Sequence, residues 1–147
     1  MDIYVFSSKN LTNIWAAIGA RKWAVSIPQS KNPSIRTRGR KLPIGSLGLF
    51  YCVKEQSLTT PFVIRSKPSQ EALIENIWPE IWALPFNIIP FGSPDKRLHK
   101  NRLNDLLPSL KNKKTNWNKL IFVSPNTVFS ASKITEEDWS VLINSLV

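Results

Sequence analysis

Two strand-like segments separated by a short polar turn constrain the fold of this chain most. Residues 45–54 (GSLGLFYCVK) and 59–66 (TTPFVIRS) are rich in β-branched and aromatic residues, a composition that is typical of buried strands. Only residues 55–58 separate the two segments, and a connection that short favours antiparallel pairing. The sequence therefore predicts a β-sheet that contains this hairpin.

The remainder of the chain alternates between strand and helix patterns. Further extended segments are predicted over residues 3–7, 22–27, 82–92 and 119–124. Helices are predicted over residues 10–20, 68–77, 93–107 and 134–146, the last with a capping box formed by Thr135 and Asp138. Trp15 and Trp139 are assigned to the buried faces of the first and last helices. Residues 28–43 hold three prolines and are predicted as a loop.

Together these patterns predict a single α+β domain over residues 1–147. About six strands with short helices between them favour a curled mixed β-sheet or β-barrel. No apolar run approaches the roughly 18 residues that a membrane-spanning helix needs, and the first residues, MDIYVFSS, lack the apolar region of a signal peptide. We therefore expect an intracellular, cytoplasmic protein that does not contact a membrane.

The charge of the chain is strongly positive and unevenly distributed. Twenty Lys and Arg residues against ten Asp and Glu give a net charge of +10, which favours polyanionic partners such as nucleic acid. Residues 31–41 contain five basic side chains and no acidic one, and residues 96–119 contain eight basic side chains and one acidic one. The predicted phosphate-binding residues are Lys31, Arg36, Arg38, Arg40, Lys41, Lys96, Arg97, Lys100 and Arg102.

The residues that catalysis or metal binding would need are scarce. One His and one Cys cannot supply a zinc site, and the chain has neither a glycine-rich phosphate loop nor a GxSxG motif. A Cys52/His99 nucleophile pair is disfavoured because Cys52 lies in the middle of a predicted strand. The only carboxylate grouping outside the last helix, Glu71, Glu75 and Glu80, is interpreted as a solvated helix face. We therefore expect a binding protein without metal, cofactor or catalytic residues.

Six tryptophans are unusually many for 147 residues. Trp78 and Trp82 flank a proline in the sequence NIWPEIWALPF, whereas Trp23 and Trp117 lie near basic residues. Aromatic rings beside cations suit a site that stacks a base and holds its phosphates. The alternative is that each ring covers one end of the barrel.

Several segments, taken in order, carry a family resemblance. After an initial strand and helix they are KWAVS, GLFYCVK with PFVIRS, IWPEIWALPFNIIPF, DKRLHKNRL and SKITEEDWSVL. In this order the chain resembles the YTH and EVE domains of the PUA-like superfamily over nearly its whole length. KWAVS is similar to a strand of YTH domains, whereas the IWP segment and the last helix are similar to those of EVE domains.

The resemblance implies a curled β-barrel flanked by helices, with a pocket that accepts one flipped base. By position, Trp23 matches the first tryptophan of the YTH aromatic cage, and Trp78 is the candidate for the second. Asn13 falls where YTH domains place an Asp or Asn facing the edge of the base. Ser26, Trp82 and Trp117 complete the expected base-binding set. A cage tryptophan must admit a base, so Trp23 and Trp78 are expected to be partly exposed.

The function that this resemblance implies is the reading of a modified base, N6-methyladenine. Methylated DNA is favoured over RNA, and the implied role is the specificity module of a modification-dependent restriction system. A nuclease or NTPase is then the implied partner, or a further domain of a larger protein. Two alternatives stay open: an RNA-binding PUA-like protein without a modification preference, and a small nuclease that uses Glu71, Glu75 or Glu80.

Overall fold

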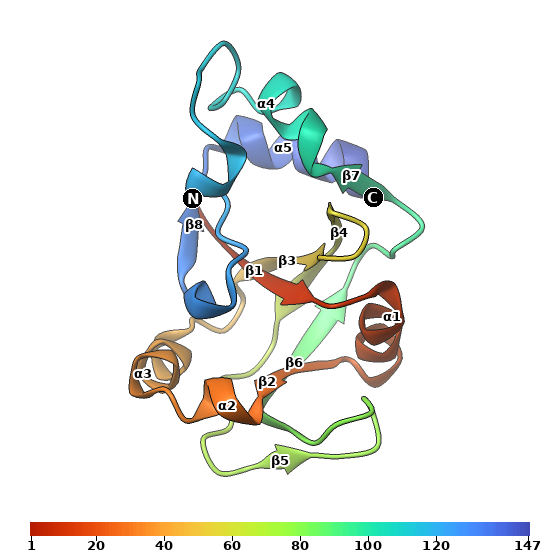
Figure 1. Cartoon of the computed structure of the whole chain (residues 1–147), viewed down its shortest axis with the longest axis vertical. Coiled ribbons are helices and arrows are strands. Elements are labelled where there is room, and N and C mark those ends of the chain that lie inside the picture. The colour runs from red at the N-terminus through yellow and green to blue at the C-terminus, as the bar shows by residue number, and fades with distance from the viewer.

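The predicted hairpin forms the middle of the sheet in the computed structural model, which describes all 147 residues (Figure 1). Strands β3 (Leu47–Cys52) and β4 (Ser57–Ile64) pair antiparallel, as expected. The main path of the sheet runs β2-β6-β4-β3-β1-β8, with β5 beside β6 and β7 beside β4. The β1–β3 pair is parallel and the other pairs are antiparallel, so the sheet is mixed. The predicted α+β fold with a curled mixed sheet is therefore confirmed.

The bounds of the other strands follow the predictions in part. They are β1 (Asp2–Ser8), β2 (Lys22–Ser26), β5 (Leu73–Ile74), β6 (Trp82–Pro90), β7 (Arg97–His99) and β8 (Ala131–Lys133). Irregularities interrupt the pairing of β2 with β6 after Trp23 and of β3 with β4 after Gly48. Such irregularities bend strands and increase their twist, which helps this sheet to curl.

The sheet carries a hydrophobic core on each face because side chains alternate along its central strands. Tyr4 and Phe6 of β1 belong to the first core, whereas Ile3 and Val5 belong to the second. β3 divides in the same way, with Phe50 in the first core and its neighbours in the second. The first core packs against α1 (Leu11–Ala20) and α3 (Pro33–Lys41), and the second against α4 (Leu103–Leu106) and α5 (Glu136–Leu146).

Gly48 shows how closely the first core is packed. A Cβ atom at this position would lie 2.4 Å from the ring of Phe62, well inside van der Waals contact. Phe62 is fully buried on the neighbouring strand, with its ring centroid 4.8 Å from that of Phe50. The glycine therefore provides the space that the buried Phe62 ring occupies.

The prediction that residues 28–43 form a loop is wrong. The segment contains most of α2 (Ile27–Ser30) and all of α3. Pro28 and Pro33 lie in the first turns of these helices, where a missing N–H breaks no helical hydrogen bond. Ser26 and Asn32 cap the two helices through their side-chain oxygens. The prolines therefore begin helices in this segment instead of preventing them.

Three further predictions differ from the structure. Residues 68–77 do not form a helix; Ser69 accepts a hydrogen bond from the Ala72 N–H, but the next residues pair with β6 as β5. Residues 119–124 do not form a strand: Lys119 ends the short 3-10 helix η2 (Trp117–Lys119), and residues 120–124 follow it without regular structure. Residues 93–107 form β7, the 3-10 helix η1 (Lys100–Arg102) and the short α4 in place of one helix.

No helix is long and apolar enough to cross a membrane.

The two tryptophans assigned to helix cores have different environments. Trp139 is half-buried and packs against the second core. Trp15 is 46% exposed, so its assignment to the core is wrong. The buried side of α1 is formed by Asn13, Ile14 and Ala17, and this face is rotated away from Trp15.

The predicted capping box of α5 is present, and it depends on Asp138. This buried carboxylate accepts hydrogen bonds from the backbone N–H groups of Ser109, at 2.9 Å, and Thr135, at 3.0 Å, and from the Ser109 hydroxyl. Burial alone raises the pKa of the Asp138 carboxyl, but these hydrogen bonds together outweigh burial and lower its pKa below the ordinary 3.8. The ionised form therefore stabilises the fold.

Asp138→Ala should lower the free energy of unfolding at pH 7 by about 2–3 kcal/mol, because the hydrogen bonds that the charged carboxylate accepts from Ser109 and Thr135 are all lost. The contribution of Asp138 is fully present above its ordinary pKa of 3.8 and disappears as the pH falls through the lowered pKa of the folded state. Chemical unfolding at pH 7 and at successively more acidic pH values measures this. The exposed Glu137→Ala serves as the control, and equal stability of the two variants at pH 7 would contradict the assignment.

Candidate functional site

A cavity of about 510 Å³ opens between the end of β1, strand β2 and the first turns of α1 and α2. The segment around Ser124 and Pro125 and the residues before β6 close its sides. Figure 1 shows α1 and α2 at either end of β2, in the half of the molecule away from α4 and α5. The cavity lining is mainly apolar with a few polar groups, which is typical of a ligand site.

Two tryptophans from paired strands form the aromatic part of the lining. Trp23 of β2 and Trp82 at the start of β6 both line the cavity, with ring centroids 5.1 Å apart and planes at 81°. The pairing of β2 with β6, which sets Ser26 opposite Trp82, brings the two rings together. Trp23 also packs edge-on against Phe50, at 4.7 Å. Packing therefore fixes the positions of both rings.

Trp78, the sequence-based candidate for the second cage wall, does not line the cavity. Its ring stacks on Trp82 with centroids 4.3 Å apart and planes at 11°. Trp78 also donates a hydrogen bond from Nε1 to the carbonyl oxygen of Asn13, at 3.0 Å. The structure therefore gives the cavity-facing place to Trp82 and makes Trp78 its support.

The expectation that both cage tryptophans are partly exposed is wrong. Trp23 is 3% exposed and Trp78 is 5% exposed, and both belong to the first hydrophobic core. Trp82 is the half-buried ring of the three. The ring positions are therefore set by the core itself, and only part of the aromatic cluster faces the cavity.

Asn13 supplies a polar group to the cavity. Its backbone N–H is held by the side chain of the N-cap residue Asn10, at 2.9 Å, and its carbonyl accepts from Trp78. Its side chain lines the cavity and makes no hydrogen bond within the chain, although the residue is only 9% exposed. A side-chain amide can donate and accept at once, so Asn13 is free to pair with a ligand that has both groups.

Ser26 lines the cavity, but its hydroxyl belongs to the capping box of α2. It accepts from the Gln29 N–H at 3.3 Å, while Gln29 Oε1 accepts from the Ser26 N–H at 3.2 Å. Gln29 also donates from Nε2 to the carbonyl of Pro125, at 3.0 Å, and both residues line the cavity. Gln29 was missed in the sequence, although the pattern S-x-x-Q before a helix is a signal that could have identified it.

The basic residues of 31–41 divide into two groups. Arg36 donates to the carbonyls of Ser30 and Gln70, and Arg38 donates to those of Val128, at 3.1 Å, and Asn126, at 2.7 Å. These two guanidinium groups attach α3 to neighbouring loops. The side chains of Lys31, Arg40 and Lys41 are exposed, and they are the cations that this segment presents to solvent.

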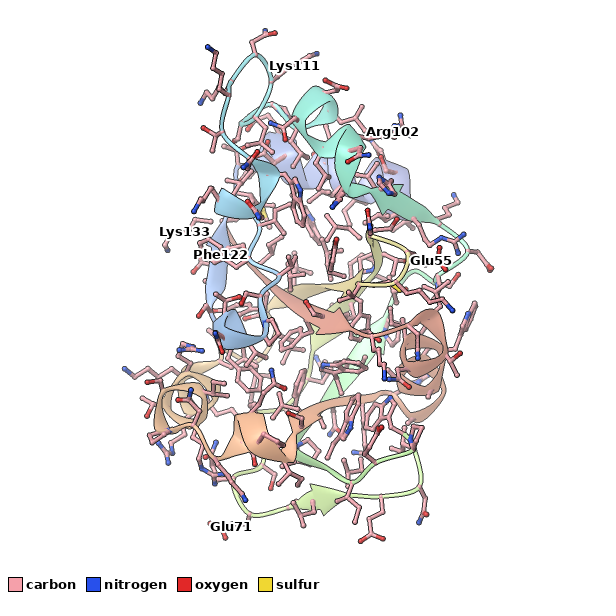
Figure 2. All side chains as sticks on the ribbon, in the orientation of Figure 1. Glu55, Glu71, Arg102, Lys111, Phe122 and Lys133 are labelled. Atoms are coloured by element: carbon pink, nitrogen blue, oxygen red, sulfur yellow. The ribbon has the colours of Figure 1, made fainter.

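The second basic segment, 96–119, lies over the other face of the sheet. Lys96 donates to the Val147 carbonyl at 2.7 Å, and Arg97 donates to the Pro94 carbonyl at 2.9 Å. Figure 2 shows Arg102 and Lys111 at the end of the molecule opposite Glu71. The structure therefore does not gather the predicted phosphate-binding residues into one patch around the cavity.

The remaining candidates lie outside the cavity, with one exception. Trp117 stacks on Tyr51 at 5.4 Å beside the second core. Cys52 is fully buried, and the Nδ1 atom of His99 accepts a hydrogen bond from the Asn101 N–H at 3.1 Å.

Of the three glutamates, Glu80 lines the cavity. The helix expected to align it with Glu71 and Glu75 is absent. No group of three or more His, Cys, Asp or Glu side chains is placed to hold a metal ion.

Among solved structures, YTH domains have a fold similar to that of this chain. The Mmi1 YTH domain is 14% identical, with a TM-score of 0.60, and the match covers 98% of this chain and 96% of that one. A Toxoplasma CPSF4 YTH domain is 14% identical, with a TM-score of 0.57 and coverage of 97% and 82%. The YTH domain of Zygosaccharomyces rouxii MRB1, solved with N6-methyladenosine RNA, is 17% identical, with a TM-score of 0.53 and coverage of 74% and 68%.

No protein-family model and no curated protein matches the sequence. At identities of 14–17% the structural likeness shows the fold alone. The resemblance to YTH domains stated from the sequence is therefore confirmed at the level of the fold.

Proposed function

We propose that this protein is a non-catalytic reader that takes one flipped base of an RNA strand into the cavity beside Trp23 and Trp82. The cavity itself carries the proposal, because two tryptophans and the free amide of Asn13 line the same space. Aromatic rings stack on any base, whereas an amide distinguishes bases by their donors and acceptors. The fold shared with YTH domains supports this interpretation.

The proposed ligand is N6-methyladenine. Adenine offers a donor and an acceptor that suit the Asn13 amide, and a methyl group on N6 would be buried against aromatic carbon. Structural neighbours were solved with N6-methyladenosine RNA, m6A-modified RNA and m6A. These neighbours favour RNA over the DNA that the sequence resemblance suggested, and they give no support to a restriction system or a nuclease partner.

The free energy gained by stacking and methyl burial is similar in size to the cost of flipping the base out of its strand. Extruding a base from a stacked strand costs a few kcal/mol, and stacking on aromatic side chains returns about 1–3 kcal/mol per base. Burial of one methyl group adds about 0.8 kcal/mol. The net charge of +10 supplies the remaining attraction to phosphates.

Titration with matched strands tests the proposal. Four oligonucleotides of one sequence, methylated or plain, as RNA or DNA, are titrated into the protein at one salt concentration. The methylated RNA should bind at least roughly fourfold more tightly than the plain RNA, since 0.8 kcal/mol is the contribution of one buried methyl group. Asn13→Ala should relax the choice of base in the same assay and leave the helix cap intact, because the cap uses only its backbone N–H.

Equal affinity for the two RNA strands would overturn the proposal in favour of RNA binding without a modification preference. Tighter binding of the methylated DNA would overturn the choice of RNA. Metal-dependent cleavage of any of the strands would show that the protein is an enzyme and not a reader.

A further inference from the structure

We infer that the cavity also accepts a methylated base with a positive charge, N1-methyladenine, and that Glu80 selects for this charge. The inference rests on the proposed function, because it takes the cavity as the place where a flipped base enters. It goes beyond that function because a positional isomer of N6-methyladenine becomes a second ligand. Glu80 carries it, since Glu80 and Lys9 are the only charged residues that line the cavity.

The connection between β5 and β6 holds Glu80 at the cavity (Figure 1). In this connection Trp78 is buried and donates from Nε1 to the carbonyl oxygen of Asn13, at 3.0 Å. Glu80 and Trp82 both line the cavity, whereas Ile81 between them does not and is 45% exposed. Successive side chains alternate in this way where a chain becomes extended. The Glu80 side chain therefore lies on the cavity side of the chain together with the Trp82 ring.

The Glu80 carboxylate is available to a ligand. Its side chain is exposed, and the chain's one ion pair joins Lys133 to Asp2. Lys9 follows β1 and does not pair with Glu80. An unpaired carboxylate beside apolar surface attracts a ligand that brings a positive charge.

The aromatic rings of the cavity favour the same kind of ligand. A tryptophan ring has a negative face and attracts a cation placed over it within about 6 Å. Trp78 covers one face of Trp82, with centroids 4.3 Å apart and planes at 11°, so only the other face can receive a base. Trp23 adds a second ring at 81° to Trp82. Two rings and a carboxylate thus line a space in which a positive charge is stabilised.

The donors of N1-methyladenine match the two polar side chains better than those of N6-methyladenine do. N6-methyladenine is neutral and has one N6–H donor, whereas N1-methyladenine is cationic at neutral pH and keeps both N6–H donors of adenine. The amide oxygen of Asn13 accepts from one donor, and the Glu80 carboxylate, which can only accept, takes the other. Because the positive charge is shared between N1 and N6, both hydrogen bonds are charge-assisted.

Matched titrations at pH 7 test the inference. The ligands are three RNA strands of one sequence with adenine, N6-methyladenine or N1-methyladenine at one position, and the three corresponding nucleosides. The wild type should bind the N1-methyladenine strand at least roughly fivefold more tightly than the plain strand, since a cation over an aromatic ring adds to the buried methyl group. The nucleosides carry no phosphate, so the same order among them assigns the preference to the cavity.

Glu80→Gln removes the charge and keeps the shape of the side chain. The affinity for N1-methyladenine relative to N6-methyladenine should fall about two- to fivefold, as for other exposed ion pairs, and the fall should be smaller at high salt. Comparing two isomers in one variant cancels any change in the attraction to phosphates. Glu80→Asp should keep most of the preference. Glu75→Gln changes an exposed carboxylate of the same connection that does not line the cavity, and it should leave the ratio unchanged.

Equal affinity of the wild type for the N1-methyladenine and plain strands would overturn the inference. The same ratio between the isomers in wild type and Glu80→Gln, or an equal fall in Glu75→Gln, would also overturn it. If N1-methyladenine is preferred through Glu80 but the N6-methyladenine and plain strands bind alike, the inference stands and the choice of N6-methyladenine fails. If N6-methyladenine is preferred over plain adenine and N1-methyladenine is not, the proposed function stands and the inference fails.

Discussion

Replacing Trp23 with alanine should lower the free energy of unfolding by about 3–5 kcal/mol, as for other large buried aromatic residues. The ring contacts Phe50, Trp78 and Trp82 and is 3% exposed. Removing it would leave a void in the first core next to the cavity. Urea unfolding of wild type and variant measures the difference.

Trp15→Ala is the matched control, because Trp15 is 46% exposed on α1. Exposed substitutions of this kind usually change stability by no more than about 0.5 kcal/mol. A Trp23→Ala protein as stable as the Trp15→Ala protein would show that the ring is not part of the core.

Replacing Trp82 with alanine should mainly reduce binding. Trp82 is half-buried, lines the cavity and lies on Trp78. Loss of one stacking ring should cost about 1–3 kcal/mol of affinity for a methylated RNA strand, roughly 5- to 150-fold. Stability should fall less than in Trp23→Ala, because Trp82 is only half-buried whereas Trp23 is almost fully buried. Titration and unfolding of the same preparation separate the two effects.

Trp117→Ala controls for the loss of a half-buried tryptophan away from the cavity. Trp117 stacks on Tyr51 beside the second core, so its variant should keep the affinity of the wild type for methylated RNA. An unchanged affinity in Trp82→Ala would exclude Trp82 as a wall of the base site.

The central strands and the last helix could be predicted because their local sequence patterns favour the same conformation that tertiary packing gives them. The alternating runs of β3 and β4, and the capping box at Thr135, act over a few residues and need no distant partner. Trp23 and Asn13 were named from the family resemblance and both line the cavity, and their role in binding a base stays a prediction. For these elements, local pattern and tertiary structure favour the same conformation.

The errors arise where distant contacts decide the structure. Leu73 and Ile74 pair with β6, and this pairing replaces the helix that residues 68–77 would favour locally. Arg36 and Arg38 appear in the sequence as free cations, but carbonyls more than 30 residues away hold them. The choice between Trp78 and Trp82 as the cavity wall depends on the pairing of β2 with β6, which spacing along the chain does not reveal.

The alternation of two cores along β1 and β3 has a consequence for how such a fold can diverge. Substituting one apolar residue for another changes one core slightly, and cores tolerate such exchanges when volume and pattern are kept. Inserting or deleting one residue within β1 would exchange Ile3 and Val5 with Tyr4 and Phe6, and both cores would fail together. Exchanges of single side chains in these strands should therefore be tolerated far better than changes in the length of β1, which is compatible with a similar fold at 14–17% identity.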